Sequence, residues 1–294
     1  MMGMSFEPNI IIPHTSQVYM MLNRLVDTRR IVFFTGLPGV GKSLLINQLA
    51  HLAHFSGYRV YLLQWDVLRN AFMTDRIVSL FPDTDGITHS VVRRAAGLWV
   101  RQAVAQWHQK YLGEKSILIG EAPLIGNRLI ELALPRNDAA ESILLEESTR
   151  FVLPVPSRRI RRIIETARQT SIKNPRDYRE LNDASPEVLK TLWTELIRAA
   201  TALHIPTPPK GSDEDYDPKI YQSVYIRVLK HRRYEVTRLN VTLSTHSRSV
   251  YAFGMPVEEM IPTASEVSNS IEEVEHHYPK LCTLEKEMEE WYVS

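Results

Sequence analysis

The chain has 294 residues, a net charge of +1 and a single cysteine, Cys282. This length allows one large domain or two small ones, and the near-neutral charge argues against a general nucleic-acid coat or a polybasic membrane anchor. One cysteine cannot form an internal disulfide, and no run approaches the roughly 18 apolar residues of a membrane span. The N-terminal stretch has no basic segment and no long apolar one, so we expect no secretory signal and a cytoplasmic location.

The first 30 residues predict an extended arm and a short amphipathic helix that Thr15 or Ser16 can cap. The next 18 residues, IVFFTGLPGVGKSLLINQ, cover positions 31–48. An apolar run that is typical of a buried strand leads into the pattern G-x-x-x-x-G-K-S, and an apolar helical pattern follows it. With a strand before it and a helix after it, this pattern predicts a phosphate-binding loop.

The chemistry of such a loop explains its residue types. Gly36, Gly39 and Gly41 leave out the Cβ atoms that would keep a polyphosphate from the backbone. Successive N–H groups and the following helix N-terminus direct positive dipoles at the anion, while a lysine reaches the β- and γ-phosphates and a serine hydroxyl ligates Mg²⁺. No N-K-x-D motif for reading guanine is present, which favours ATP over GTP. The predicted nucleotide-binding residues are Gly36, Leu37, Pro38, Gly39, Val40, Gly41, Lys42, Ser43 (also the Mg²⁺ ligand) and Leu44.

Four further strands alternate with helices along the chain. This alternation predicts a parallel sheet with helices on both faces. We therefore expect an α/β protein with a P-loop NTPase fold and a mainly parallel, five-stranded sheet. The other strands are expected at 58–64, 116–120, 150–155 and 235–245, and helices near 44–56, 88–111, 126–133, 158–170, 186–203 and 221–231.

A carboxylate and an arginine follow the second predicted strand. Asp66 stands at its end, which in an open parallel sheet faces the ligand crevice, and Arg69 lies three positions on. If a helix begins here, both side chains can face a transferred phosphate. The alternative is that Asp66 caps the helix, and the two roles are compatible.

The loop GLPGVGKS, followed after one helix and one strand by D-x-x-R, resembles the P-loop kinases that act on small molecules and polynucleotides. That group includes adenylylsulfate kinase, polynucleotide 5′-kinases and enzymes of the zeta-toxin type. The resemblance covers about residues 30–170. It implies that Asp66 orients or deprotonates the acceptor hydroxyl and that Arg69 binds an acceptor phosphate. It also implies a central phosphate-loop strand, between the third and fourth strands, and a lid after the fourth.

Two more candidates follow the third predicted strand. Glu121 ends it within ILIGEAPL and is similar to the acidic residue that closes the equivalent strand in nucleotide kinases. Its carboxylate can hold a Mg²⁺-bound water or position a nucleophile, and the alternative is again a helix cap. Arg128, on a predicted helix, is a candidate substrate contact.

An arginine-rich helix follows the fourth predicted strand, where the resembling kinases carry their lid. Lid arginines neutralise charge on the transferring phosphoryl group and exclude water when they close. The alternative is a solvated basic face opposite an apolar stripe. Spacing does not choose among Arg158, Arg159, Arg161, Arg162 and Arg168, although Arg158 and Arg162 share a helical face and are our candidates.

These predictions give three expected parts: an N-terminal arm and helix (1–30), a P-loop kinase-like domain with a lid near 157–170 (31–255), and an acidic C-terminal extension (256–294). The predicted function is Mg²⁺-dependent transfer of the ATP γ-phosphate to a hydroxyl of a small molecule or a nucleic-acid end, the acceptor being unidentified. One alternative is a P-loop ATPase that couples hydrolysis to a conformational change, with Glu121 positioning water. Another is a nucleotide-binding regulatory module without turnover. The predicted catalytic residues are Lys42, Asp66, Glu121, Arg158 and Arg162.

Overall fold

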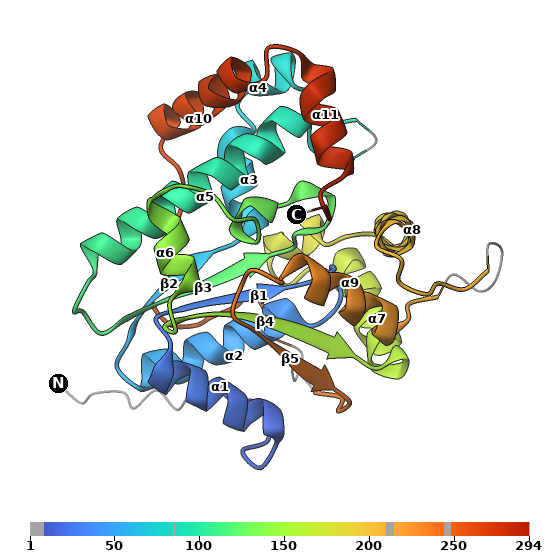
Figure 1. Cartoon of the computed structure of the whole chain (residues 1–294). Coiled ribbons are helices and arrows are strands. Elements are labelled where there is room, and N and C mark those ends of the chain that lie inside the picture. Colours follow the sequence, from blue (N-terminus) through green and yellow to red (C-terminus); the bar gives the residue numbers. More distant parts are fainter. Residues whose placement is uncertain (1–8, 85, 210–214, 244–247, 294) are drawn as a thin grey trace.

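One parallel sheet lies at the centre of the chain in the computed structural model, which describes residues 9–84, 86–209, 215–243 and 248–293 (Figure 1). Its strands are β1 (Ile31–Thr35), β2 (Arg59–Leu63), β3 (Ser116–Ala122), β4 (Thr149–Pro156), β5 (Tyr234–Leu239) and β6 (Glu258–Glu259). The strand order is β5-β4-β1-β3-β2-β6, and every pairing is parallel. Strand β1 therefore lies between β3 and β4, as expected. The sheet has six strands where five were expected, because the two-residue β6 joins the edge beside β2.

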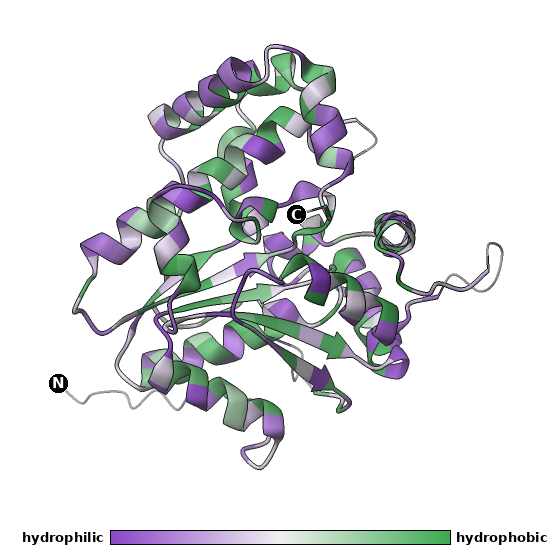
Figure 2. Cartoon of the chain, viewed as in Figure 1, coloured by the Kyte–Doolittle hydropathy of each residue, from purple (hydrophilic) through white to green (hydrophobic). Residues whose placement is uncertain are grey.

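Alternate residues of β1 feed two separate cores, one on each face of the sheet. Val32 and Phe34 pack with α1 (Gln17–Thr28) and α2 (Lys42–Phe55), whereas Ile31 and Phe33 pack toward α5 (Ser90–Lys110) and the helices around it. Figure 2 shows the central strands hydrophobic along most of their length, while the outer helices alternate between hydrophobic and hydrophilic positions. A strand buried on both faces explains the continuous apolar run IVFFT.

The remaining elements surround this sheet. They are α3 (Trp65–Phe72), α4 (Asp75–Leu80), α6 (Ala139–Leu145), α7 (Arg158–Lys173), α8 (Pro186–Ala202), α9 (Pro218–Val228), α10 (Ala264–His277), α11 (Leu281–Glu289) and the 3-10 turns η1 (Ile125–Asn127), η2 (Ile130–Leu132) and η3 (Tyr178–Asn182). The prediction of a single helix over 126–133 is wrong. Asn127 and Leu129 have φ of +57° and +63°, and these positive angles divide the segment into two single turns.

Most other expected elements are present with shifted ends. Ser16 caps α1 by accepting a hydrogen bond from the Tyr19 N–H at 3.1 Å. Helix α9 begins at Pro218 with Asp217 as its cap, three residues before the expected start. The last expected strand ends early, at Leu239. The end of that prediction (244–245) and part of the acidic loop (210–214) lie outside the described residues.

The last 39 residues supply β6, α10 and α11. Helix α10 packs along α5, and Val274, Leu284 and Trp291 are buried in the same core cluster as Phe33 of β1. Arg94 of α5 also forms a 3.0 Å ion pair with Glu287 of α11. Among the helices that the structure describes, none is long and apolar enough to cross a membrane.

Candidate active site

The loop between β1 and α2 has the backbone that its glycines predict. Gly36, Gly39 and Gly41 have φ of +131°, +78° and +91°, a region that other residues seldom adopt. Neighbouring side chains also need the missing Cβ atoms: one on Gly36 would lie 2.0 Å from the Tyr221 hydroxyl, and one on Gly39 would lie 3.1 Å from the Arg161 guanidinium carbon. The loop is thus enclosed by side chains of α7 and α9.

The N-terminus of α2 has no side-chain cap. Its N-cap is Gly41, which has no side chain, whereas Ser157 caps α7 and Ser185 caps α8. Lys42, Ser43 and Leu44, in the first turn of α2, line a cavity of about 600 Å³. An uncapped helix N-terminus directs N–H groups and positive dipole into this cavity, an arrangement that favours an anion.

Not every predicted loop residue reaches the cavity. Pro38, Gly39 and Gly41 line it, together with the first turn of α2. Leu37 and Val40 are buried in the core at 2% and 0% exposure, and Gly36 is covered by Tyr221. The side chains of Leu37 and Val40 therefore anchor the loop to the protein.

Lys42 is buried and held by three oxygens. Its Nζ donates to the carbonyls of Gly36 and Leu37, both at 2.8 Å, and lies 3.2 Å from Oε1 of Glu121. Burial lowers the pKa of Lys42, while the neighbouring carboxylate of Glu121 acts in the opposite direction. Strands β1 and β3 are adjacent, so this register brings the loop lysine and the predicted acidic residue together.

Asp66 faces the cavity from the first turn of α3. The N-cap of this helix is Gln64, so Asp66 does not act as its cap. No hydrogen bond or ion pair engages the Asp66 carboxylate within the part of the chain that the structure describes. The pKa of Asp66 is raised to about 6, mainly because protein surrounds the carboxylate and, to a smaller extent, because Glu121 repels its charge. The attraction of Arg168 acts in the opposite direction. The carboxylate is therefore free to meet a ligand and to accept a proton near neutral pH.

The two predicted substrate arginines differ in their partners. Arg69 lines the cavity, but it forms an ion pair with Asp83, and its Nε donates to the Thr88 hydroxyl at 2.7 Å. Arg128 also lines the cavity, and none of the described carboxylates lies within ion-pair distance of it. Burial lowers the pKa of Arg128, which Glu195 partly offsets. Of the two, Arg128 is the one available to an anionic group.

The structure does not bring Arg158 and Arg162 to the cavity. Both point away from it on α7, each in a 2.6 Å ion pair, Arg158 with Asp217 and Arg162 with Asp215. Their side chains are 58% and 70% exposed, so this shared face of α7 is the solvated one.

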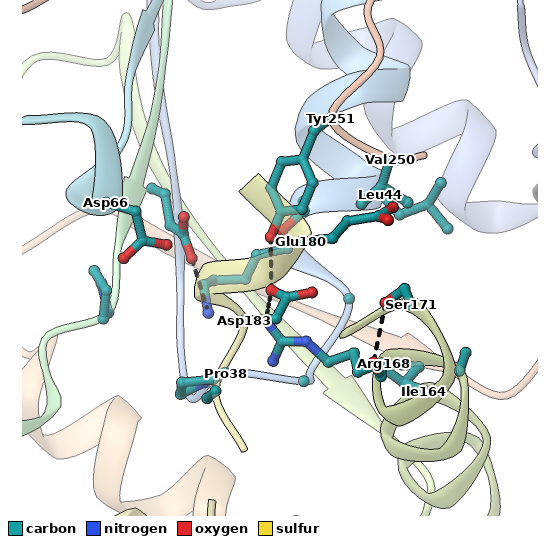
Figure 3. A pocket seen from close by; sticks show the side chains of 18 of the residues that line it. Pro38, Leu44, Asp66, Ile164, Arg168, Ser171, Glu180, Asp183, Val250 and Tyr251 are labelled. Carbon is teal, nitrogen blue, oxygen red and sulfur yellow. Dashed lines mark hydrogen bonds and ion pairs between the residues drawn. The ribbon is translucent and has the colours of Figure 1, made fainter. Parts of the chain in front are cut away.

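Two other arginines of α7 face inward. The Arg161 guanidinium donates to the Pro38 carbonyl of the loop. Arg168 lines the cavity and forms an ion pair with Asp183, which also accepts a 2.8 Å hydrogen bond from the Tyr251 hydroxyl (Figure 3). Burial opposes the charge of Arg168, but Asp183 outweighs it and raises the arginine's pKa. Residues 161 and 168 are seven apart, two helical turns, and this spacing is the signal that could have selected them.

The residues at the cavity fit Mg²⁺ only together with bound phosphates. Among the described residues, no group of three His, Cys, Asp or Glu side chains could hold a metal ion by itself. Mg²⁺ usually keeps several waters and takes one or two protein oxygens beside substrate phosphates. The Ser43 hydroxyl and the Glu121 carboxylate, both at the cavity wall, match that sparse donor set.

Comparison with known proteins adds no relative to this picture. No family model, curated protein or solved structure matches the chain.

Proposed function

We propose that the chain is a P-loop phosphotransferase that moves the γ-phosphate of ATP to an acceptor hydroxyl in a Mg²⁺-dependent reaction. One arrangement carries the proposal. The uncapped N-terminus of α2, the Lys42–Glu121 pair and the unpaired carboxylate of Asp66 all face one cavity. Phosphoryl transfer requires mainly positioning and charge neutralisation, which these groups provide.

In the proposed reaction the acceptor oxygen forms a bond to the γ-phosphorus. The bond between that phosphorus and the β,γ-bridging oxygen breaks, and its electron pair leaves with ADP. The acceptor proton passes to the carboxylate of Asp66, whose pKa of about 6 suits a general base near neutral pH. Lys42 and the N–H groups of α2 hold the nucleotide phosphates. Ser43, and Glu121 through water, would hold Mg²⁺, which neutralises phosphate charge when bound.

The charge that develops on the transferring group needs cations beyond Lys42. Arg168 is the α7 arginine suited to this role, because it lines the cavity while Arg158 and Arg162 point to solvent. Arg161 contacts the loop backbone and is suited to hold the loop in place. Arg128 can meet an anionic group that lies in the main cavity.

The test follows the label of γ-labelled ATP with Mg²⁺ and a panel of 5′-hydroxyl oligonucleotides, nucleosides, nucleotides, sugars and aminoglycosides. We expect label on an acceptor, and a decrease of about 10²- to 10⁴-fold in Asp66→Asn with affinity for a non-hydrolysable ATP analogue retained. Asp27→Asn, at an exposed position on α1, is the matched control and should behave as wild type. Label found only as free phosphate, at a rate unchanged in Asp66→Asn, would instead indicate the hydrolase.

A further inference from the structure

A second, smaller cavity of about 270 Å³ opens on the other side of Asp66. It shares Asp66, Asn70, Glu121 and Tyr251 with the main cavity, so these residues form a common wall. Its other walls come from the end of β2, the side of α3 that carries Ala71, turn η3, and the chain around β6. A ligand in this second cavity can reach Asp66 without occupying the space beside the phosphate loop.

Carboxylates outnumber cations at the wall of this second cavity. Asp66 is unpaired, and Glu259 adds a further carboxylate. The cation at the wall, Arg179, is already engaged: it forms a two-point pair with Asp177 at 2.9 Å, lies 3.5 Å from Glu259, and donates to the Tyr251 carbonyl. Two carboxylates already share this one guanidinium, so the wall offers no spare positive charge to an anionic ligand.

Gln64 gives an independent indication of a ligand. This residue lines the second cavity and is only 5% exposed, yet its amide oxygen has no hydrogen-bond partner among the described residues. A buried polar atom without a partner is costly, and rotation of the amide would let a ligand group satisfy it. The Tyr178 ring, 67% exposed, adds an uncharged surface at the same wall.

We infer that the second cavity is the acceptor site, and that the acceptor is a small, uncharged or cationic compound with several hydroxyl or amino groups. This inference rests on the proposed function, since it places the acceptor hydroxyl beside Asp66. Carboxylates and an unpaired amide favour hydrogen-bond donors and disfavour phosphate. The volume lies just below the roughly 300–1,000 Å³ of drug-sized ligand sites, which fits a single sugar ring and not a polynucleotide end.

The experiment measures binding to the full-length protein by ligand-observed NMR, with Mg²⁺ and a non-hydrolysable ATP analogue present. The probes are glucosamine (cationic), myo-inositol (neutral) and glucose 6-phosphate (anionic). We expect glucosamine and myo-inositol to bind, and Gln64→Leu to weaken them roughly tenfold through the lost hydrogen bond. Ala71→Leu, which fills the second cavity from α3 without lining the main one, should abolish their binding.

Ser171→Ala is the comparison variant, because Ser171 lines only the main cavity and has no part in the proposed reaction. It should leave glucosamine and myo-inositol binding unchanged. Binding of glucose 6-phosphate alone, lost in Arg128→Gln and kept in Ala71→Leu, would overturn the inference, as would binding of none of the three probes.

A parallel assay with γ-labelled ATP separates this inference from the proposed function. Binding that Ala71→Leu abolishes, without label on any acceptor, would support the second cavity as a ligand site and contradict phosphoryl transfer. Label that reaches an acceptor equally well in wild type, Gln64→Leu and Ala71→Leu would support transfer and overturn the assignment of the acceptor site.

Discussion

At the scale of single residues, Asp66 combines a free carboxylate with surroundings that disfavour its charge. Protein encloses it, Glu121 and Asp183 repel it, and the attraction of Arg168 and Arg128 does not compensate, so its pKa rises to about 6. The side chain is exposed to the two cavities, where a ligand can replace water. As the proposed base, a carboxylate with a pKa of about 6 would bind the acceptor proton more tightly than an ordinary aspartate with a pKa of 3.8.

The same pKa shift predicts that Asp66 destabilises the folded protein at neutral pH. The folded state binds the proton with a pKa of about 6, against 3.8 as the ordinary value, so folding stability falls as pH rises from about 4 to about 6. Asp66→Asn should therefore raise the thermal midpoint at pH 7–8, and the gain should vanish near pH 4. Thermal unfolding of both proteins across this range checks it. A gain that is the same at pH 4 and pH 8 would contradict the linkage.

At the scale of elements, the Arg168–Asp183–Tyr251 network joins α7, the segment before α8 and the chain around residue 251. Each element brings one charged or polar group to the cavity wall, and Asp183 accepts hydrogen bonds from both Arg168 and Tyr251. Arg168 attracts the charged form of Asp66, whereas Asp183 repels it. Asp183 therefore positions the arginine and also contributes to the electrostatic field at Asp66, the proposed base.

Arg168 and Asp183 shift the pKa of Asp66 in opposite directions, so the pH profile of the proposed phosphoryl transfer tests this network. Transfer should rise with pH around 6 as Asp66 ionises. Asp183→Asn removes a repelling charge and should move the rise to lower pH, whereas Arg168→Gln removes an attracting charge and should move it to higher pH. The two variants should also slow transfer roughly tenfold or more, because the arginine is misplaced or missing. Arg159→Gln, exposed on α7, should leave the profile unchanged. Equal shifts in one direction from both network variants would contradict the assignment.

How far the sequence predicts each element depends on how local its signal is. The predicted phosphate loop is recognisable because its glycines, lysine and serine lie within eight consecutive residues. The choice among the α7 arginines cannot be made from the sequence, because it depends on which face of the helix meets the loop. Arg161 and Arg168 share that face with Ile164, on the side that the apolar stripe was expected to occupy alone. Asp183 and Tyr251 belong to segments without a motif and reach the site only through tertiary packing.

At the scale of the whole molecule, the last 39 residues combine an acidic composition with a buried apolar face. Ten glutamates against two lysines make this segment the acidic C-terminal extension of the sequence. The apolar residues between them, spaced at three and four, nevertheless give α10 and α11 one buried face each. Val267, Ile271 and Val274 of α10 join the core that also contains Phe33 of β1. Acidic residues on the outer face and apolar residues on the inner one fit an amphipathic outer layer of the fold.

A matched pair of leucines on α11 tests whether this layer folds together with the sheet. Leu284 is fully buried in the shared core, and Leu281 is 41% exposed three residues earlier. Leu284→Ala should lower the free energy of unfolding by about 2–5 kcal/mol, through lost burial and the cavity left behind, while Leu281→Ala should change it by less than about 0.5 kcal/mol. Urea unfolding followed by tryptophan fluorescence and by circular dichroism should shift as one transition, because α11 and β1 share a core. An early, separate transition in Leu284→Ala, with the main midpoint unchanged, would instead mean that residues 256–294 fold independently of the sheet. In that case the main cavity, which the described residues beyond 255 do not line, would stay intact, whereas the second cavity would lose Glu259 and Ile261 from its wall. Nucleotide binding measured below the main transition would then survive, and binding at the proposed acceptor site would not.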